Sequence, residues 1–271
     1  MLQITPDELK QIQLDLLDVV DTFCREKGLT YYLFVGTLLG AVRHKGYIPW
    51  DDDIDICMVR EDYDRFFKEF NLSNDHHVKA ICHETSNNYY LASGKVIDTR
   101  TVLKEKIDAK LSIGVFIDIF PMDRLPDDQI VIKDFNRKLN VYRKLLLIKN
   151  ITPSTDRKWY KNFALISAKI PLSLLSRSFV LDRIDNLAQK YRDVDNCTRI
   201  GDLAVFTYDL KELFFANDFE NTVELEFERK KYLAPAGYDN ILSQLFGDYL
   251  KLPPIEKRVP HHAYEAYWKE S

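Results

Sequence analysis

The stretch Asp51-Asp52-Asp53-Ile54-Asp55 constrains this chain more than any other part of its sequence. Acidic and apolar residues alternate as this stretch continues to Val59, which predicts a β-strand over 53–59. Alternate side chains of a strand point to opposite faces, so Asp53 and Asp55 are expected to project together, with Asp51 able to join them. Carboxylates crowded on one face repel each other unless a cation neutralises them, and hard oxygen ligands favour Mg²⁺ or Mn²⁺. A solvated acidic turn is the alternative, but the apolar residues on both sides argue against it.

A glycine turn precedes the acidic stretch. The aromatic and β-branched segment Leu29–Val35 predicts a buried strand, and Leu38–Arg43 predicts a short helix after Gly36 and Thr37. A glycine where a strand opens into a helix lets a phosphate approach the free N–H groups, and the Thr37 hydroxyl can donate to it. Alone, the pair fits a simple turn equally well. Followed by the acidic strand, it resembles the layout of the nucleotidyltransferase fold.

A third carboxylate stands in an apolar strand. Asp118 is the single charged residue of the segment Gly114–Pro121. An ionised carboxylate in such surroundings needs a cation or hydrogen-bond donors, so we interpret Asp118 as a ligand rather than a passive core residue. Asp123 follows Pro121 and is interpreted as a turn residue.

The remaining pattern predicts an α/β (α+β) protein with a mixed sheet of the nucleotidyltransferase type. Thr5-Pro6-Asp7-Glu8 predicts a capped helix start, and Gly28 predicts its end. Other expected elements are a helix over Arg60–Phe70 and strands over Val78–His83, Ala92–Ile97, Thr101–Lys106 and Val115–Phe120. We expect a catalytic core over residues 1–125 and, over 126–271, a mainly helical, basic lobe whose C-terminal tail returns to the active site.

Composition and charge narrow the possible partners. The chain has 271 residues, of which 46% are hydrophobic, and this excludes a disordered protein. The four cysteines are isolated from one another, so neither a disulfide framework nor a zinc site is expected. No secretory signal or membrane span is recognisable, which predicts a cytoplasmic protein.

The charge is unevenly distributed along the chain. The segment Lys133–Arg183 has twelve Lys/Arg and three Asp/Glu, although the net charge of the whole chain is −4. Its cations are interleaved with aromatic and aliphatic residues, which predicts peripheral binding to an anionic membrane surface at the inner face of the plasma membrane. A helical lobe with solvated lysines and a basic groove for an anionic glycan are the alternatives. No nucleic acid partner is expected.

The string from Gly36 to Asp55, GTLLGAVRHKGYIPWDDDID, resembles the signature of the LicD family. These are bacterial phosphocholine transferases, distantly similar to fukutin and fukutin-related protein. Phe116–Pro121 and a tail from Phe246 through Arg258 to His262 also resemble the family. The resemblance implies a nucleotidyltransferase-type fold and transfer of phosphocholine from CDP-choline, or a similar nucleotide-linked donor, to a sugar hydroxyl. The acceptor would be a lipid-linked precursor of a cell-surface glycan, of the teichoic acid or lipopolysaccharide type.

The resemblance also implies roles for particular residues. Asp53, Asp55 and Asp118 would be ligands of Mg²⁺ or Mn²⁺, and Gly36 and Thr37 would contact the phosphate. The base that accepts the sugar proton is left open between Asp51, Asp118 and a tail histidine, His261 or His262. The cations expected to meet the anionic donor are Arg43, His44, Lys45 and, in reserve, Lys95.

Two alternatives to phosphocholine transfer remain, one of them catalytic and one non-catalytic. A nucleotidyltransferase that passes NMP from an NTP to a small molecule or protein would need the same acidic triad. A non-catalytic protein that binds a glycan or lipid would have no reason to keep three carboxylates so close together.

Overall fold

A computed structural model describes residues 1–73, 77–104, 111–154, 157–195, 197–205, 209–259 and 265–270. Its main sheet has the order β1-β2-β6-β4-β3, and β7 and β8 extend it from the far half of β6. Strands β2 and β6 are parallel and the other neighbours are antiparallel. The expected mixed sheet in an α/β (α+β) fold is therefore confirmed. The strands are β1 (Tyr32–Leu33), β2 (Asp55–Val59), β3 (Val78–Ile81), β4 (Gly94–Asp98), β6 (Phe116–Leu125), β7 (Arg199–Gly201) and β8 (Leu213–Phe215).

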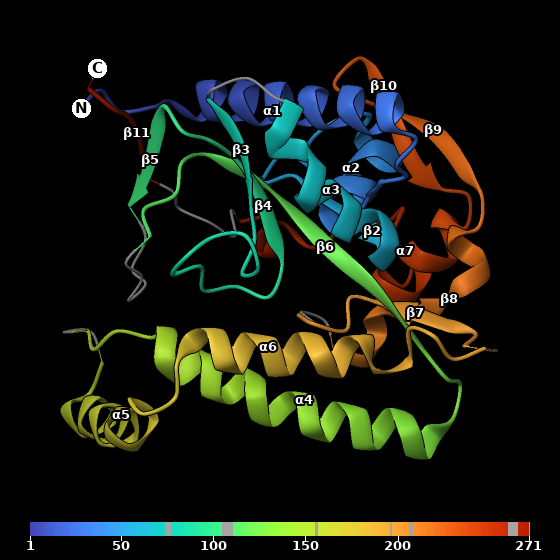
Figure 1. The fold of residues 1–271 in the computed structure, drawn as a ribbon. Coiled ribbons are helices and arrows are strands. Elements are labelled where there is room, and N and C mark those ends of the chain that lie inside the picture. The colour runs from blue at the N-terminus through green and yellow to red at the C-terminus, as the bar shows by residue number, and fades with distance from the viewer. Residues whose placement is uncertain are drawn as a thin grey trace.

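Helices lie on both sides of this sheet (Figure 1). One group packs near its upper side in the view, and a second group, α4 with α5 and α6, forms a separate layer below (Figure 1). The first group is α1 (Pro6–Lys27), α2 (Val35–His44), α3 (Arg60–Ser73) and α7 (Tyr238–Phe246). The second is α4 (Gln129–Asn150), α5 (Trp159–Leu172) and α6 (Arg177–Ala188). Two further strand pairs flank the sheet: β5 (Thr101–Lys104) with β11 (Glu265–Trp268), and β9 (Thr222–Phe227) with β10 (Lys230–Pro235).

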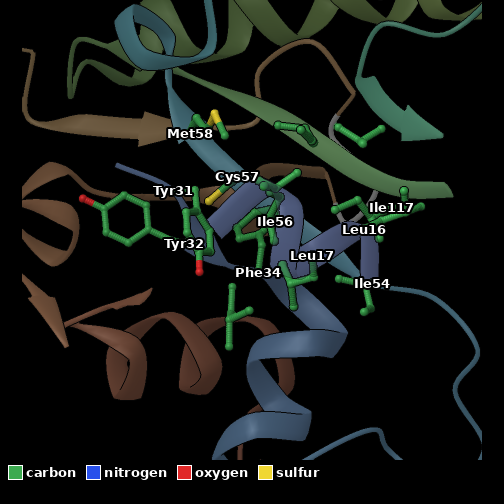
Figure 2. Close-up of a cluster of buried hydrophobic side chains, with 14 of the residues drawn as sticks. Leu16, Leu17, Tyr31, Tyr32, Phe34, Ile54, Ile56, Cys57, Met58 and Ile117 are labelled. Carbon is green, nitrogen blue, oxygen red and sulfur yellow. The ribbon is translucent and has the colours of Figure 1, made fainter. Parts of the chain in front are cut away.

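The main core lies between the sheet and α1. Thr5 caps this helix in a reciprocal capping box with Glu8, and Gly28 ends it in the left-handed conformation, as the sequence predicts. The apolar face of α1 brings Leu16 and Leu17 against Ile56 and its neighbours on β2 (Figure 2). All four cysteines are buried and free. This core holds β2 firmly, and the start of β2 carries the acidic residues.

Strand β6 is longer than the sequence suggests. The expected strand ended at Phe120, whereas β6 continues through Pro121 to Leu125. Proline is tolerated because it lies where β6 changes antiparallel neighbours, from β4 at residues 116–119 to β7 at 123–125. The interpretation of Asp123 as a turn residue is therefore wrong. It is a buried residue of β6, and Arg60 donates to both of its oxygens at 2.8 and 2.6 Å.

The junction between β1 and α2 also differs from expectation. Only Tyr32–Leu33 of the predicted strand 29–35 pairs with β2, and α2 already begins at Val35. Val35 has a φ of +41°, which is rare for a β-branched residue. Strand β2 begins at Asp55, so Asp53 precedes the strand and does not share its alternation. The close approach of α2 explains why β2 begins late, because the Thr37 hydroxyl of α2 accepts the N–H of Asp55.

A second, smaller apolar cluster holds the lower helical layer to the rest of the chain. It joins Leu125 of β6 to α4 and α6, through Ile132, Phe135, Leu139, Val180 and Ile184 among others. Strand β8 contributes Leu213 to this cluster and Phe214 to the main core, whereas β10 and α7 contribute Tyr232 and Leu242 to the main core. The boundary expected at residue 125 stays a prediction.

In the described part of the chain, no single helix is both long and apolar enough to cross a bilayer. The segments Trp159–Leu172 and Arg177–Tyr191 meet the length and composition only when combined, and they are bent by 82°.

Candidate active site

Three charged side chains occupy one row across the sheet. Asp55 of β2 is in register with Asp118 of β6, and Asp118 is in register with Lys95 of β4. Side chains in register on adjacent strands share a face of the sheet, so these three meet on one side. The Lys95 ammonium donates to both oxygens of Asp118 at 2.7 and 2.9 Å, and it also lies 3.2 Å from the centroid of the Phe116 ring. One buried cation therefore compensates one carboxylate of the row.

The carboxyl of Asp55 has no such cation of its own within the row. Burial raises its pKa well above the ordinary value, and the charges of Asp53, Asp118 and Asp51 raise it further. Lys95 offsets only part of this effect. A further positive charge nearby would therefore favour the ionised form of Asp55. Carboxylate oxygens are the ligands that Mg²⁺ and Mn²⁺ prefer, so the residues present fit such an ion.

The remaining acids lie in the loop before β2. The carboxylate oxygens of Asp51, Asp52 and Asp53 lie within 4.8 Å of one another. In the described residues, Asp53, Asp55 and Asp118 do not form a group of that closeness; Asp118 turns to Lys95 instead. The assignment of these three as metal ligands stays a prediction; the structure places the predicted Asp51 in this loop group and adds Asp52 to it.

The first turn of α2 positions both the loop acids and the strand. The Thr37 hydroxyl oxygen accepts the N–H of Asp55 at 2.8 Å, and the Phe34 N–H donates to the Asp55 carbonyl at 3.0 Å. A methyl group at Gly36 would lie 2.8 Å from a carboxylate oxygen of Asp51. Glycine at this position therefore lets Asp51 approach the positive end of the helix. Thr37 is buried and supports β2, and the expected phosphate contacts of Gly36 and Thr37 remain predictions.

The other end of α2 carries a cationic and aromatic cluster. Arg43 donates to the ring of His44 at 2.9 Å and to the carbonyl of Tyr249 at 2.8 Å. Arg258 lies 5.5 Å from the centroid of the Trp50 ring, and that ring lies 6.3 Å from His44. Burial and the charge of Arg258 lower the pKa of Arg43, and burial together with Arg43 lowers that of His44. Both lowered pKa values reflect burial beside neighbouring positive charge, a setting that suits an anionic ligand.

Lys45 caps α2 in the left-handed conformation with an exposed side chain, and its carbonyl accepts the N–H of Glu228. It therefore lies at the edge of the cluster rather than inside it. His261 and His262 lie outside the described residues. Arg258 was not predicted as a site residue, although the tail in which it stands resembles the family's; only the fold brings it beside Trp50.

Comparison with known proteins decides the family. A family described as LicD/FKTN/FKRP, nucleotidyltransferase domain, matches residues 28–159. The lipopolysaccharide cholinephosphotransferase LicD of Haemophilus influenzae is 33% identical over 273 residues, covering 98% of this chain and 99% of that protein. This chain belongs to the LicD family.

Two shorter similarities are to uncharacterised proteins of other bacteria. A Rickettsia typhi protein is 41% identical over 66 residues, 22% of this chain and 21% of its own length. A Rickettsia prowazekii protein is 54% identical over 37 residues, 14% of each chain. The matched region, 28–159, includes α2, the loop acids, Lys95 and Asp118, whereas Tyr249 and Arg258 of the cationic cluster lie beyond it.

Proposed function

We propose that this protein is a phosphocholine transferase that acts on a sugar hydroxyl of a cell-surface glycan precursor. The observation that carries the proposal is the full-length similarity to a lipopolysaccharide cholinephosphotransferase. The proposed donor is CDP-choline or a similar nucleotide-linked compound, and the proposed acceptor is a lipid-linked glycan of the lipopolysaccharide or teichoic acid type. A cytoplasmic protein bound to the inner face of the membrane would meet both.

The proposed reaction breaks the phosphoanhydride bond of the donor. The sugar oxygen attacks the choline-bearing phosphorus, CMP leaves with the bridging oxygen, and the sugar proton passes to a base. A divalent cation, when bound, would neutralise charge on the two phosphates. Asp55, with Asp53 and Asp118, would hold it, because burial and then the neighbouring carboxylates raise the pKa of Asp55, and a cation would offset both effects.

The chain's own groups would position the reactants. Lys95 already donates to both oxygens of Asp118, so that carboxylate is engaged in an ion pair. Of Asp51 and Asp118, we therefore propose Asp51 as the proton acceptor. The cluster of Arg43, His44 and Arg258 supports a site for the nucleotide's anionic portion at the other end of α2.

The test is CMP release from CDP-choline with Mg²⁺ and candidate lipid-linked glycans. We expect CMP and a phosphocholine-bearing glycan in equal amounts, and a loss of both of at least a hundredfold in Asp55→Asn and Asp118→Asn. Glu226→Gln, an exposed acid on β9, is the matched control. Absence of CMP from every phospho-donor with a folded protein would contradict the proposal, and pyrophosphate release from NTPs would favour the nucleotidyltransferase alternative.

A further inference from the structure

Helix α5 has an apolar stripe that faces solvent. Trp159, Phe163, Ile166 and Ile170 follow each other at spacings of three and four, so they line one side of the helix. Their exposed fractions are 79%, 67%, 49% and 69%, and Leu174 just beyond the helix is 90% exposed. No residue of α5 is buried. In most helices of a folded protein a stripe of this kind faces the core.

The neighbouring helices do not share this feature. Tyr142, Leu145 and Leu146 of α4 pack against the smaller apolar cluster, as do Val180 and Ile184 of α6. The basic segment predicted to meet a membrane therefore divides into two parts. Helices α4 and α6 form an ordinary core with solvated lysines, whereas α5 lies at the outer end of the layer, away from the sheet (Figure 1).

The sequence over α5 is cationic between Asp156 and Asp182. From Arg157 to Leu181 the sequence has five basic residues and no Asp or Glu: Arg157, Lys158, Lys161, Lys169 and Arg177. Lys158 and Lys161 are exposed beside the stripe. Where α4 and α5 meet α6, burial and the charges of Arg177 and Lys169 lower the pKa of Lys149. Positive charge is therefore concentrated around the exposed apolar residues.

We propose that α5 and Leu174 form a membrane-docking site that lies in the interface of an anionic lipid bilayer. Fourteen residues of helix extend about 21 Å, too short for the roughly 30 Å hydrocarbon core, so α5 would lie along the surface. Its apolar stripe would enter the boundary of the acyl chains while Lys158 and Lys161 meet anionic headgroups. A second copy of this chain would bring two sets of the same cations together, which makes it a poorer occupant of the stripe.

The inference is tested by sedimentation of the full chain with vesicles, without any substrate, so it does not rest on the proposed activity. Vesicles of phosphatidylcholine alone are compared with vesicles that contain phosphatidylglycerol as well. We expect binding that requires phosphatidylglycerol and weakens with salt. Trp159→Ser with Ile170→Ser should weaken it at least tenfold, and Lys158→Gln with Lys161→Gln by about tenfold or more. Because these side chains are exposed, the variants should keep the wild-type circular dichroism and melting temperature.

Matched controls remove equally exposed groups elsewhere. Leu72→Ser with Ile255→Ser, and Lys79→Gln with Lys231→Gln, should bind as the wild type does. Brominated lipid should quench a tryptophan signal that is lost in Trp159→Phe, which still binds. Equal binding to both kinds of vesicle, equal losses in the controls, or a wild-type dimer that becomes a monomer in Trp159→Ser would each overturn the proposal.

Discussion

At the scale of single residues, the charge balance around Asp55 has a measurable consequence for stability. Its pKa is raised above the ordinary value of about 4, so the folded chain binds more protons than the unfolded chain above that pH. The free energy of unfolding should therefore fall as the pH rises from about 4 towards the folded-state pKa. Without metal, Asp55→Asn should remove this decline and stabilise the protein by about 1 kcal/mol or more at neutral pH.

Urea unfolding in EDTA at several pH values measures this effect, with Glu226→Gln as the control. Added Mg²⁺ should stabilise the wild type and not Asp55→Asn. A variant that is no more stable than the wild type at any pH, or that gains as much from Mg²⁺, would show that Asp55 is not the electrostatically disfavoured group.

The ion pair between Lys95 and Asp118 should have the opposite effect: its charges should stabilise the fold. Lys95 is 3% exposed, and its loss leaves the Asp118 carboxylate half-buried without its cation. Lys95→Met should lower the free energy of unfolding by about 2–4 kcal/mol, and Lys95→Met with Asp118→Asn should recover more than half of the loss. A double-mutant cycle by chemical denaturation gives the coupling. Strictly additive losses would mean that the two side chains do not stabilise each other.

How far the site was predictable can be judged from these two residues. Asp118 was identified because it is the lone charge in an apolar segment, a local pattern that sequence displays directly. Its pairing with Lys95 depends on the register of two antiparallel strands, which no local pattern contains. Arg258 was missed for the same reason, since its contact with Trp50 joins residues far apart in the chain.

At the scale of elements, the end of β6 is fastened by a buried ion pair. Arg60, the first residue of α3, donates to both oxygens of Asp123 and lies 3.0 Å from Asp185 of α6. Asp123→Asn removes a charge that compensates Arg60 in a buried place and should cost about 3–5 kcal/mol of unfolding free energy.

The exposed Asp134, which is bound by Arg137 and Lys138 on α4, is the matched control. Asp134→Asn should cost far less than Asp123→Asn, because solvent screens the ion pairs of Asp134. Thermal or urea unfolding of both variants makes the comparison. A similar small cost for both substitutions would show that Arg60 is satisfied by its other carboxylates alone.

Predictions of the elements from sequence failed mainly at their boundaries. The capping box of α1 and the strand period of β2 are local signals: α1 begins and ends as expected, and β2 covers 55–59 of the expected 53–59. Strand β6 continues past Pro121 because its neighbouring strand changes from β4 to β7 at this point. Neither neighbour therefore needs the N–H that proline lacks. Asp53 lies before β2 because the Thr37 hydroxyl accepts the N–H of Asp55, and this contact sets the residue at which β2 begins. Both outcomes depend on partners distant in sequence.

At the scale of the whole molecule, the elements should differ in how readily they open. Helices α4 and α6 bury residues such as Leu139 and Ile184, whereas α5 buries none. The backbone amides of α5 should therefore exchange with deuterium at least tenfold faster than those of α4 and α6. Hydrogen–deuterium exchange followed by mass spectrometry measures this difference. Vesicles that contain phosphatidylglycerol should slow the exchange of the α5 amides selectively. Equal protection of all three helices in solution would mean that α5 is covered by something other than lipid.

Strand β6 links the two ends of the molecule. It carries Asp118 near its start and Leu125 at its end, and α4 begins four residues later. No hinge separates these points, because β2, β4 and β7 hold the strand along its length. Whatever surface holds α5 would therefore also fix which way the acidic row faces. An enzyme oriented in this way searches for its acceptors in two dimensions, and meets every one of them from the same side.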